Sequence, residues 1–310
     1  MKLQTLVFNY IAYRKAMGEK FRTNGNYLNF FCRWMGDIDI ESVSSEKVEK
    51  FLYGNGPVTS AWFIKHTALT GFYEYATCRG YINVSPMPRS LPKRPPAFVP
   101  YIYTREELRR LLKTALTYQK NQSHVKPYMI QKLILLLYGT GLRLSEALLL
   151  TLADVDLFQS VITVKQTKFY KGRFVPFGEQ LGRVINEYVQ WRKEQGSPQE
   201  QESPFFYGKN NKPLNQSTME NVFQRIREKA GVRRERARYQ PRLHDLRHTF
   251  AVHRLISWYQ EHADVQQLLP ILSVYMGHTH LSATSVYLTM TNDLLQEAGR
   301  RFEKYARRGK

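Results

Sequence analysis

The sequence predicts a mainly α-helical protein, built as an N-terminal helical bundle followed by a mainly helical domain with a small antiparallel β-sheet. Three observations predict this class. Apolar residues recur at helical spacing through most of the chain. Six of the fourteen prolines lie between Pro86 and Pro100 and divide it. Residues 161–177 are the part with a hairpin pattern. With 310 residues and 43% apolar content, the chain is long enough for two hydrophobic cores.

The first domain, residues 1–85, is predicted to be a four-helix bundle with no clear helix after Tyr81. Ser44 or Ser45 is expected to cap the third helix. The helices are expected at residues 3–17, 24–35, 45–53 and 58–78. Their aromatic faces fit a bundle core better than platforms for base stacking. These aromatic residues are Tyr27, Phe30, Phe31, Trp34, Trp62, Phe63, Phe72, Tyr73 and Tyr75.

The boundary between the domains is predicted to be a proline-rich basic linker, residues 86–102. Proline limits the backbone to extended conformations and lacks an amide donor, so we expect this segment to be stiff. Arg89, Lys93 and Arg94 lie among the prolines. Two interpretations stay open at this point. The segment is either a strap along DNA, with Lys93 and Arg94 as phosphate contacts, or a plain linker.

The second domain, residues 103–310, is predicted to be mainly helical. Thr104 lies three residues before Glu107, a spacing typical of a capping box at the start of a helix. Residues 194–215 are rich in turn formers and predict a loop. A basic turn between two short apolar runs predicts a β-hairpin. The strand residues are Val161, Ile162, Val164, Phe174 and Val175.

The charge of the chain predicts a polyanionic partner. Forty-six Lys and Arg residues against 26 Asp and Glu residues leave a formal net charge of +20. Binding to such a partner is expected to weaken with salt. Membrane-surface and ribosomal proteins can also be this basic. The 13% aromatic content and the two compact-looking segments favour a nucleic-acid-binding protein instead.

Neither a membrane span nor a metal site is expected. The nearest apolar run, residues 133–142, is interrupted by Gly139 and Gly141. Cys32 and Cys78 match neither a metal-ligand spacing nor a disulfide framework, which fits a reducing cytoplasm. Both cysteines are expected to be small core residues. No cofactor is predicted.

Six residues form a set that suits chemistry on a phosphodiester. Arginines can hold the non-bridging oxygens of a phosphate, lysine and histidine can move protons, and a tyrosine hydroxyl can attack phosphorus. Such a site requires no metal. The set consists of Arg143, Lys168, His244, Arg247, His278 and Tyr287.

These residues lie in four segments that together resemble the tyrosine site-specific recombinases, also called the phage integrase family. The segments are TGLRLSEALLLTLADVD (140–156), TKFYKGRFVP (167–176), HDLRHTF (244–250) and MGHTHLSATSVYL (276–288). The resemblance covers most of residues 104–290 and, more loosely, the N-terminal helices, which look like a core-binding domain. The stretch between Arg247 and His278 is longer than in chromosome-dimer resolvases. Its sequence looks more like the sequences of integrases from transposons and similar mobile elements.

The resemblance implies a transesterification without metal or ATP. Tyr287 would attack a DNA phosphate and form a 3′-phosphotyrosyl bond. Arg143 and Arg247 would stabilise the charge that builds on the phosphate oxygens. Lys168, eight residues before the proline of a Val-Pro pair, would protonate the departing 5′ oxygen.

The histidines are expected to differ in role. The resemblance implies that His244 takes the tyrosine proton and that His278 hydrogen-bonds the phosphate. His248 and His253 lie in the same predicted helix as His244 but match no catalytic position, so we interpret them as packing residues. His280 beside His278 could suggest a metal pair, but no cysteine or carboxylate cluster accompanies it.

Charged neighbours of the set are predicted to support it. Glu146 follows Arg143 by three residues and shares a helical face with it, so it either orients this arginine or a histidine, or forms a structural ion pair. Lys165, Lys171 and Arg173 lie in the predicted hairpin and are expected to contact DNA. For the two lysines, a solvated charge is the alternative.

The C-terminal segment is expected to form a helix that contacts another protomer. Its apolar stripe is Leu295, Ala298, Phe302 and Tyr305. Docking onto its own domain is the alternative.

The expected function is integration or excision of a mobile element by a multimer on double-stranded DNA recombination sites, in the cytoplasm at the nucleoid. Partner recombinases or accessory DNA-bending proteins are conceivable partners. The competing functions are a type IB topoisomerase and a catalytically silent DNA-binding regulator.

Overall fold

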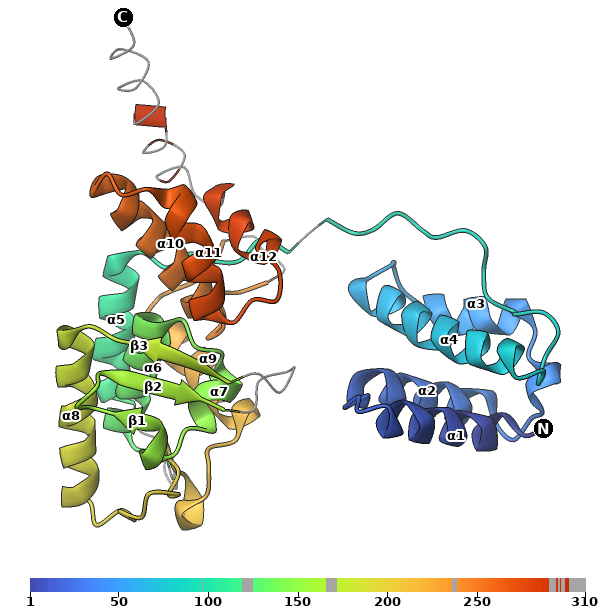
Figure 1. Ribbon diagram of the computed structural model, residues 1–310, viewed down its shortest axis with the longest axis horizontal. Coiled ribbons are helices and arrows are strands. Elements are labelled where there is room, and N and C mark those ends of the chain that lie inside the picture. Colours follow the sequence, from blue (N-terminus) through green and yellow to red (C-terminus); the bar gives the residue numbers. More distant parts are fainter. Residues whose placement is uncertain are drawn as a thin grey trace, which may run out of the picture. The chain divides into compact units, whose positions relative to one another are not determined.

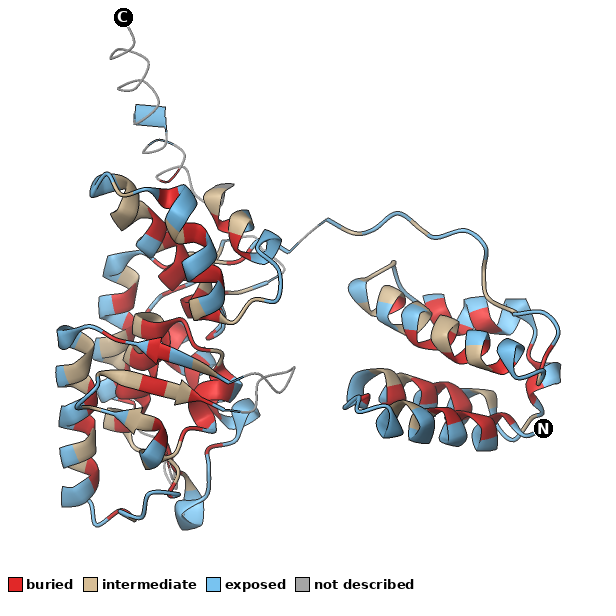
Figure 2. Cartoon of the chain, in the orientation of Figure 1, coloured by how far each residue is buried: buried red, intermediate tan, exposed pale blue. Residues whose placement is uncertain are grey.

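The chain forms two compact units, Met1–Phe98 and Val99–Lys310 (Figure 1). The division falls within the segment 86–102 that the prolines single out. Each unit has its own buried interior (Figure 2). The computed structural model describes residues 1–96, 98–118, 125–165, 172–235, 239–288, the backbone of 289, and 294, 296, 299 and 300.

The first unit is a bundle of four helices, which confirms the predicted class. The third helix is capped by Ser44, whose hydroxyl accepts a hydrogen bond from the Lys47 amide at 3.4 Å. The second helix begins at Arg22, two residues before its predicted start. The helices are α1 (Leu3–Ala16), α2 (Arg22–Met35), α3 (Ser45–Tyr53) and α4 (Ser60–Cys78), with a 3-10 turn η1 (Ile40–Ser42) before α3.

The interior of this bundle is aromatic, although not every predicted core residue lies in it. Phe31 and Phe72 are fully buried. Phe30 and Trp34 are 45% and 42% exposed and lie at the edge of the core, where their ring centroids are 5.5 and 5.7 Å from that of Phe51 in α3. Cys78 is also exposed, so its predicted place in the core is wrong. It is the last residue of α4, where the helix leaves the bundle interior.

The second unit is mainly helical, with a small antiparallel sheet. Its first helix has the predicted capping box, with Thr104 and Glu107 hydrogen-bonding each other's backbone amides at 3.1 and 2.8 Å. The helices are α5 (Arg105–Leu116), α6 (Pro127–Thr140), α7 (Leu144–Leu148), α8 (Glu179–Glu194), α9 (Gln216–Lys229), α10 (Asp245–Gln260), α11 (Val265–Met276) and α12 (Ser282–Ser285). Short 3-10 turns are η2 (Leu152–Asp154), η3 (Lys209–Asn211) and η4 (Val286–Thr289).

The sheet has the strand order β1-β2-β3, with both pairs antiparallel. The strands are β1 (Val155–Asp156), β2 (Val161–Val164) and β3 (Arg173–Pro176). Val161 pairs with Pro176 and Val164 with Arg173, so β2 and β3 are the predicted hairpin. The two-residue strand β1 was not predicted, because it is too short to show an alternating pattern.

The packing of the second unit brings several chain segments together at one place. Helices α5 to α9 and the sheet share one core, while α10, α11 and η4 share another (Figure 1). Tyr275 of α11 donates a hydrogen bond to the Pro176 carbonyl of β3 at 3.1 Å, which joins the sheet to the second group. No helix within the described ranges is long and apolar enough to cross a membrane.

Candidate active site

The second unit brings together five of the six predicted catalytic residues. Arg143 lies at the N-terminus of α7, and His244 lies at the N-terminus of α10, which also carries Arg247. His278 follows the end of α11 by two residues, and Tyr287 lies in the turn η4. These segments are far apart in sequence, so only the tertiary fold assembles the site.

Two helix C-termini hold the two arginines in place. Arg247 donates to the carbonyls of Gly141, which follows α6, and Met276, which ends α11, at 2.6 and 2.5 Å. Arg143 donates to the carbonyl of Gly277 at 2.9 Å. The last carbonyls of a helix lack intrahelical partners and carry partial negative charge, so cations bind there. A guanidinium has more N–H donors than these bonds use, which leaves donors for a phosphate.

Glycine is required at both helix ends. Gly141 and Gly277 have φ angles of +63° and +68°, a backbone conformation that favours glycine. A Cβ atom at Gly141 would lie 2.5 Å from the Phe250 ring, and one at Gly277 would lie 2.8 Å from the Arg173 guanidinium. The two glycines therefore allow the close approach that presents their carbonyls to the arginines.

A buried carboxylate links Arg143 to the sheet. Glu146 accepts a hydrogen bond from Arg143 at 2.7 Å and two from Arg173 of β3, at 3.0 and 2.8 Å. Burial raises the pKa of Glu146, but the hydrogen bonds and charge of Arg173, together with Arg143, lower it to about 2. Glu146 therefore contacts Arg143 through a charged carboxylate.

The structure contradicts the prediction that Arg173 is a DNA contact. Its side chain is only 9% exposed, and its Nε donates to the Tyr275 carbonyl at 2.8 Å. Arg173 lies on the same face of β3 as the buried Val175, because strand residues two apart share a face. It therefore fastens Glu146 and α11 to the sheet.

The two arginines give the site an excess of positive charge. Burial, and then repulsion from Arg143, lower the pKa of Arg247 to about 10. Burial, Arg247 and Arg143 likewise lower the pKa of His278 to about 4, and burial and Arg247 lower that of His244. A bound phosphate would relieve this mutual repulsion. His278 contacts the hydroxyl of Thr284 through Nδ1 at 2.7 Å, which fixes the orientation of its ring.

The hydroxyl of Tyr287 lies 3.0 Å from Nδ1 of His248. Tyr287 is 2% exposed, and burial raises its pKa although Arg247 and Arg143 lower it. The hydroxyl therefore keeps its proton at neutral pH, and a hydrogen bond joins the phenol to the imidazole. This contact overturns the interpretation of His248 as a packing residue only. The sequence did contain a signal for it, because His244 and His248 are one helical turn apart and share a face.

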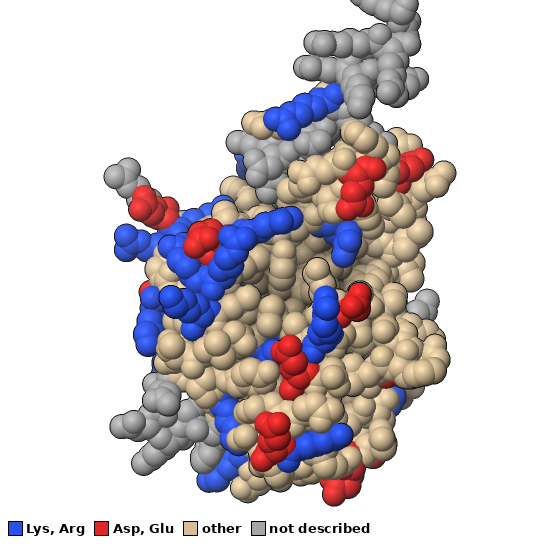
Figure 3. Space-filling model, turned by 90° about the vertical axis from the view of Figure 1, so that its left-hand side faces the viewer, with Lys and Arg blue, Asp and Glu red and all other residues tan. Residues whose placement is uncertain are grey.

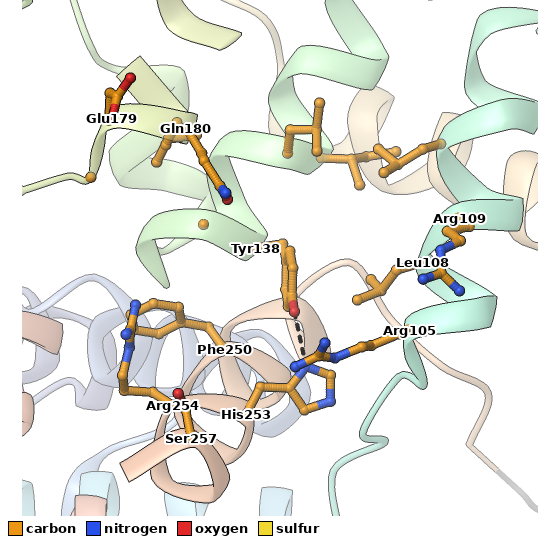
Figure 4. A pocket seen from close by; sticks show the side chains of 16 residues that line it. Arg105, Leu108, Arg109, Tyr138, Glu179, Gln180, Phe250, His253, Arg254 and Ser257 are labelled. Carbon is orange, nitrogen blue, oxygen red and sulfur yellow. Dashed lines mark hydrogen bonds between the residues drawn. The ribbon is translucent and has the colours of Figure 1, made fainter. Parts of the chain in front are cut away.

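His253 has the surroundings of a packing residue. Its Nδ1 lies 2.9 Å from the Tyr138 hydroxyl, as the dashed line in Figure 4 shows. Both residues line a cavity of about 760 Å³ between α5, α6, the start of α8 and α10. The arginines Arg105 and Arg254 also line it, whereas none of the predicted catalytic residues does.

The other predicted site residues are either exposed or lie outside the described residues. Lys165 is 58% exposed and pairs with Asp154 at 2.7 Å. Lys168 and Lys171 lie outside the described residues, as does the predicted apolar stripe of the C-terminal segment. Lys93 and Arg94 are exposed, and Arg94 lies over the Phe63 ring at 4.9 Å.

Basic side chains also gather at one edge of the face shown in Figure 3, where they outnumber acidic ones. Among the described residues, no group of three or more His, Cys, Asp or Glu is placed to hold a metal ion. The site therefore offers cations, imidazoles and one phenol, a set suited to chemistry on a phosphate.

The chain is similar over nearly its whole length to proteins that carry recombinase names. It is 32% identical over 301 residues to "Putative integrase/recombinase y4rB" of Sinorhizobium fredii, covering 96% of both chains. It is 28% identical over 272 residues to "Tyrosine recombinase XerC" of Bacillus subtilis, covering 86% of this chain and 83% of the relative.

Solved structures share the fold. A structure of the Tn1549 transposon integrase with a circular intermediate DNA matches with a TM-score of 0.72 at 19% identity, over 97% of this chain and 99% of that one. A lambda integrase tetramer bound to a Holliday junction matches with a TM-score of 0.69 at 14% identity, over 95% and 78%. The model of the phage integrase family matches residues 102–293. The chain thus belongs to the phage integrase family and is a tyrosine recombinase that acts in site-specific DNA recombination.

Proposed function

We propose that Tyr287 is the nucleophile that cleaves DNA and forms a 3′-phosphotyrosyl intermediate. The observation that carries this proposal is the placement of its hydroxyl in a buried site, 3.0 Å from Nδ1 of His248, where burial raises its pKa and the charges of Arg247 and Arg143 act against that rise. The same two guanidinium groups would bind the non-bridging oxygens of the attacked phosphate and stabilise the charge that develops on them.

The other members of the set handle hydrogen bonds and protons. His278 donates to a phosphate oxygen through Nε2, because its Nδ1 is held by Thr284. Lys168 protonates the departing 5′ oxygen. The phosphodiester energy stays in the covalent link, so a 5′ hydroxyl of a partner strand can reverse the step without metal or ATP.

The reaction requires paired duplexes and therefore several protomers. We infer that the protein works as a multimer on double-stranded DNA sites, at the nucleoid of its cell, with or without partner recombinases or DNA-bending proteins. The first unit acts as the core-binding domain. Residues 86–102 lie along the DNA, and Lys93 and Arg94 contact its phosphates. Lambda integrase, which shares the fold, forms a dimer on a core site and a tetramer on a Holliday junction in solved structures.

The substrate is proposed to be the ends of a mobile element. The relative at 32% identity carries the name integrase/recombinase, and the Tn1549 transposon integrase shares the fold. The C-terminal segment from Leu295 onward would pass to a neighbouring protomer and couple assembly to cleavage.

The test is a covalent-adduct assay. Nicked duplexes from the DNA that flanks the gene are mixed with the protein and run on a denaturing gel. The unmodified protein should give a protein–DNA adduct, and Tyr287→Phe should give none while it still shifts the DNA. Tyr275→Phe is the matched control, since its hydroxyl donates to the Pro176 carbonyl of β3, and it should keep the adduct.

An adduct that persists in Tyr287→Phe would rule out this nucleophile. A clear shift without any adduct from the unmodified protein would favour the silent DNA-binding regulator. Relaxation of any supercoiled plasmid by the monomer would favour the type IB topoisomerase.

A further inference from the structure

His248 has a place in the active site that the known roles of the six-residue set do not explain. It lies next to Arg247 on α10, and its Nδ1 contacts the Tyr287 hydroxyl across 39 residues of sequence at 3.0 Å. The two rings are tilted by 59° with centroids 5.6 Å apart. No hydrogen bond between His244 and Tyr287 is found among the described residues. His244 instead lies edge-on against His248, with ring centroids 5.2 Å apart.

The protonation states fit a donor tyrosine and an acceptor histidine. Burial and the charges of His244, Arg247 and Arg242 lower the pKa of His248 to about 4, although Asp245 raises it. The imidazole is therefore neutral at neutral pH. When the hydrogen of the neutral ring is on Nε2, Nδ1 of His248 accepts the hydrogen bond of the Tyr287 hydroxyl, and this is the tautomer that proton transfer to Nδ1 requires.

We propose that His248 accepts the proton of Tyr287 through Nδ1 when the tyrosine attacks the DNA phosphate. This inference rests on the proposed role of Tyr287 and replaces His244 as the group that receives the proton. A phosphate between the arginines adds negative charge beside His248. It offsets the cations that keep the free imidazole neutral and favours the imidazolium as the reaction proceeds.

The step balances in atoms and charge. The O–H bond of Tyr287 and the bond from phosphorus to the 5′ oxygen break, while the bond from the tyrosine oxygen to phosphorus forms. The tyrosine proton passes to Nδ1 of His248, which becomes an imidazolium. Lys168 gives a proton to the 5′ oxygen and becomes a neutral amine. In the reverse step, His248 returns its proton to the departing tyrosine.

Two substitutions separate proton transfer from packing. His248→Asn places an amide oxygen near the position of Nδ1, so it can accept the hydrogen bond but not the proton. His253→Asn is the matched control, because His253 lies on the same helix and contacts a tyrosine hydroxyl in the same way, at 2.9 Å. Melting temperature and DNA shift are measured for both variants.

Single-turnover cleavage of two nicked duplexes is the readout. One duplex carries the ordinary 5′ oxygen, and the other carries sulfur at that bridging position, a leaving group that needs no proton. His248→Asn should slow cleavage of both duplexes about 100-fold or more. Lys168→Ala should slow only the oxygen duplex. His253→Asn should cleave both at the unmodified rate.

Two results would overturn the proposal. One is cleavage by His248→Asn within about threefold of the unmodified rate. The other is recovery of this variant on the sulfur duplex, which would place His248 on the leaving-group side. If His248→Asn has a lowered melting temperature, the test is instead the pH dependence of the rate at which the unmodified protein cleaves the sulfur duplex. The rate should fall in acid as His248 becomes protonated, and a flat profile would count against the proposal. An adduct from Tyr287→Phe would instead overturn the proposed nucleophile.

Discussion

Glu146 shows how one buried residue can organise several cations. Its carboxylate receives Arg143 and Arg173 on its two oxygens and is 8% exposed. Without this carboxylate, the guanidinium groups of Arg143 and Arg173 would repel each other at a poorly solvated site. Because its pKa is depressed to about 2, this carboxylate stabilises the fold above the unfolded pKa near 4.5 and loses that contribution as the pH falls toward 2.

Glu146→Gln should therefore destabilise the second unit and weaken catalysis. Removing one partner of a buried ion pair costs about 3 kcal/mol, because the remaining charges lose their compensation. Displacement of Arg143 should slow adduct formation by at least about tenfold. Urea unfolding and the nicked-duplex assay measure the two effects. Glu179→Gln is the control, since its pair with Arg183 is exposed and such pairs contribute about 0–1 kcal/mol. Equal stability of the two variants would contradict the prediction.

The histidines show which parts of the site the sequence could predict. His244 and His278 were identified from their motifs, and the fold places the His278 ring 6.2 Å from the Tyr287 ring and the His244 ring 5.2 Å from the His248 ring. His248 was missed, because its partner is 39 residues away and only tertiary packing creates the contact. Arg173 was assigned to DNA from its charge, although its position two residues before the buried Val175 indicated an inward side chain.

Among the secondary-structure elements, the ends of α6 and α11 determine the geometry of the site. A glycine with positive φ follows each helix, and carbonyls at the two helix ends accept hydrogen bonds from Arg247 and Arg143. The sequence predicted the helices of the first unit well, because a helical repeat is a local property. It contained no sign that the ends of α6 and α11 both bind the Arg247 side chain, since this depends on how α10 packs against the two helices.

Gly141→Ala should cost more than a change at an unconstrained helix end. The new Cβ meets the Phe250 ring at 2.5 Å and adopts a left-handed backbone, which together cost about 3 kcal/mol. Gly231→Ala is the matched control in the same unit, with φ +64° and no atom within 4 Å of the new Cβ. It should cost about 1 kcal/mol. Urea unfolding compares them. A Gly141→Ala variant as stable as the control, with full adduct formation, would refute this account of the helix end.

At the scale of the whole molecule, we expect DNA recognition and chemistry to be divided between the two units. All described members of the catalytic set lie in Val99–Lys310. The first unit has a separate hydrophobic core and exposed cations on three of its helices, including Lys15, Arg22 and Lys50. A unit with its own core folds independently when few contacts tie it to the rest of the chain.

We expect a fragment of residues 99–310 to keep the chemistry and to bind DNA much more weakly. It should form the adduct on nicked duplexes at low salt, because all six residues of the proposed set lie within this part of the sequence. Every phosphate that the first unit would neutralise should contribute about 0.9 to the slope of log affinity against log salt, so the fragment should show a shallower slope. Fragment 1–98 should give a helical circular-dichroism spectrum and a cooperative melt, which tests its separate core. Gel shifts across a salt series compare fragment 99–310 with the full chain. If the two slopes are equal, the cations of the first unit do not contact DNA; if the fragment binds normally but forms no adduct, part of the active site comes from the first unit.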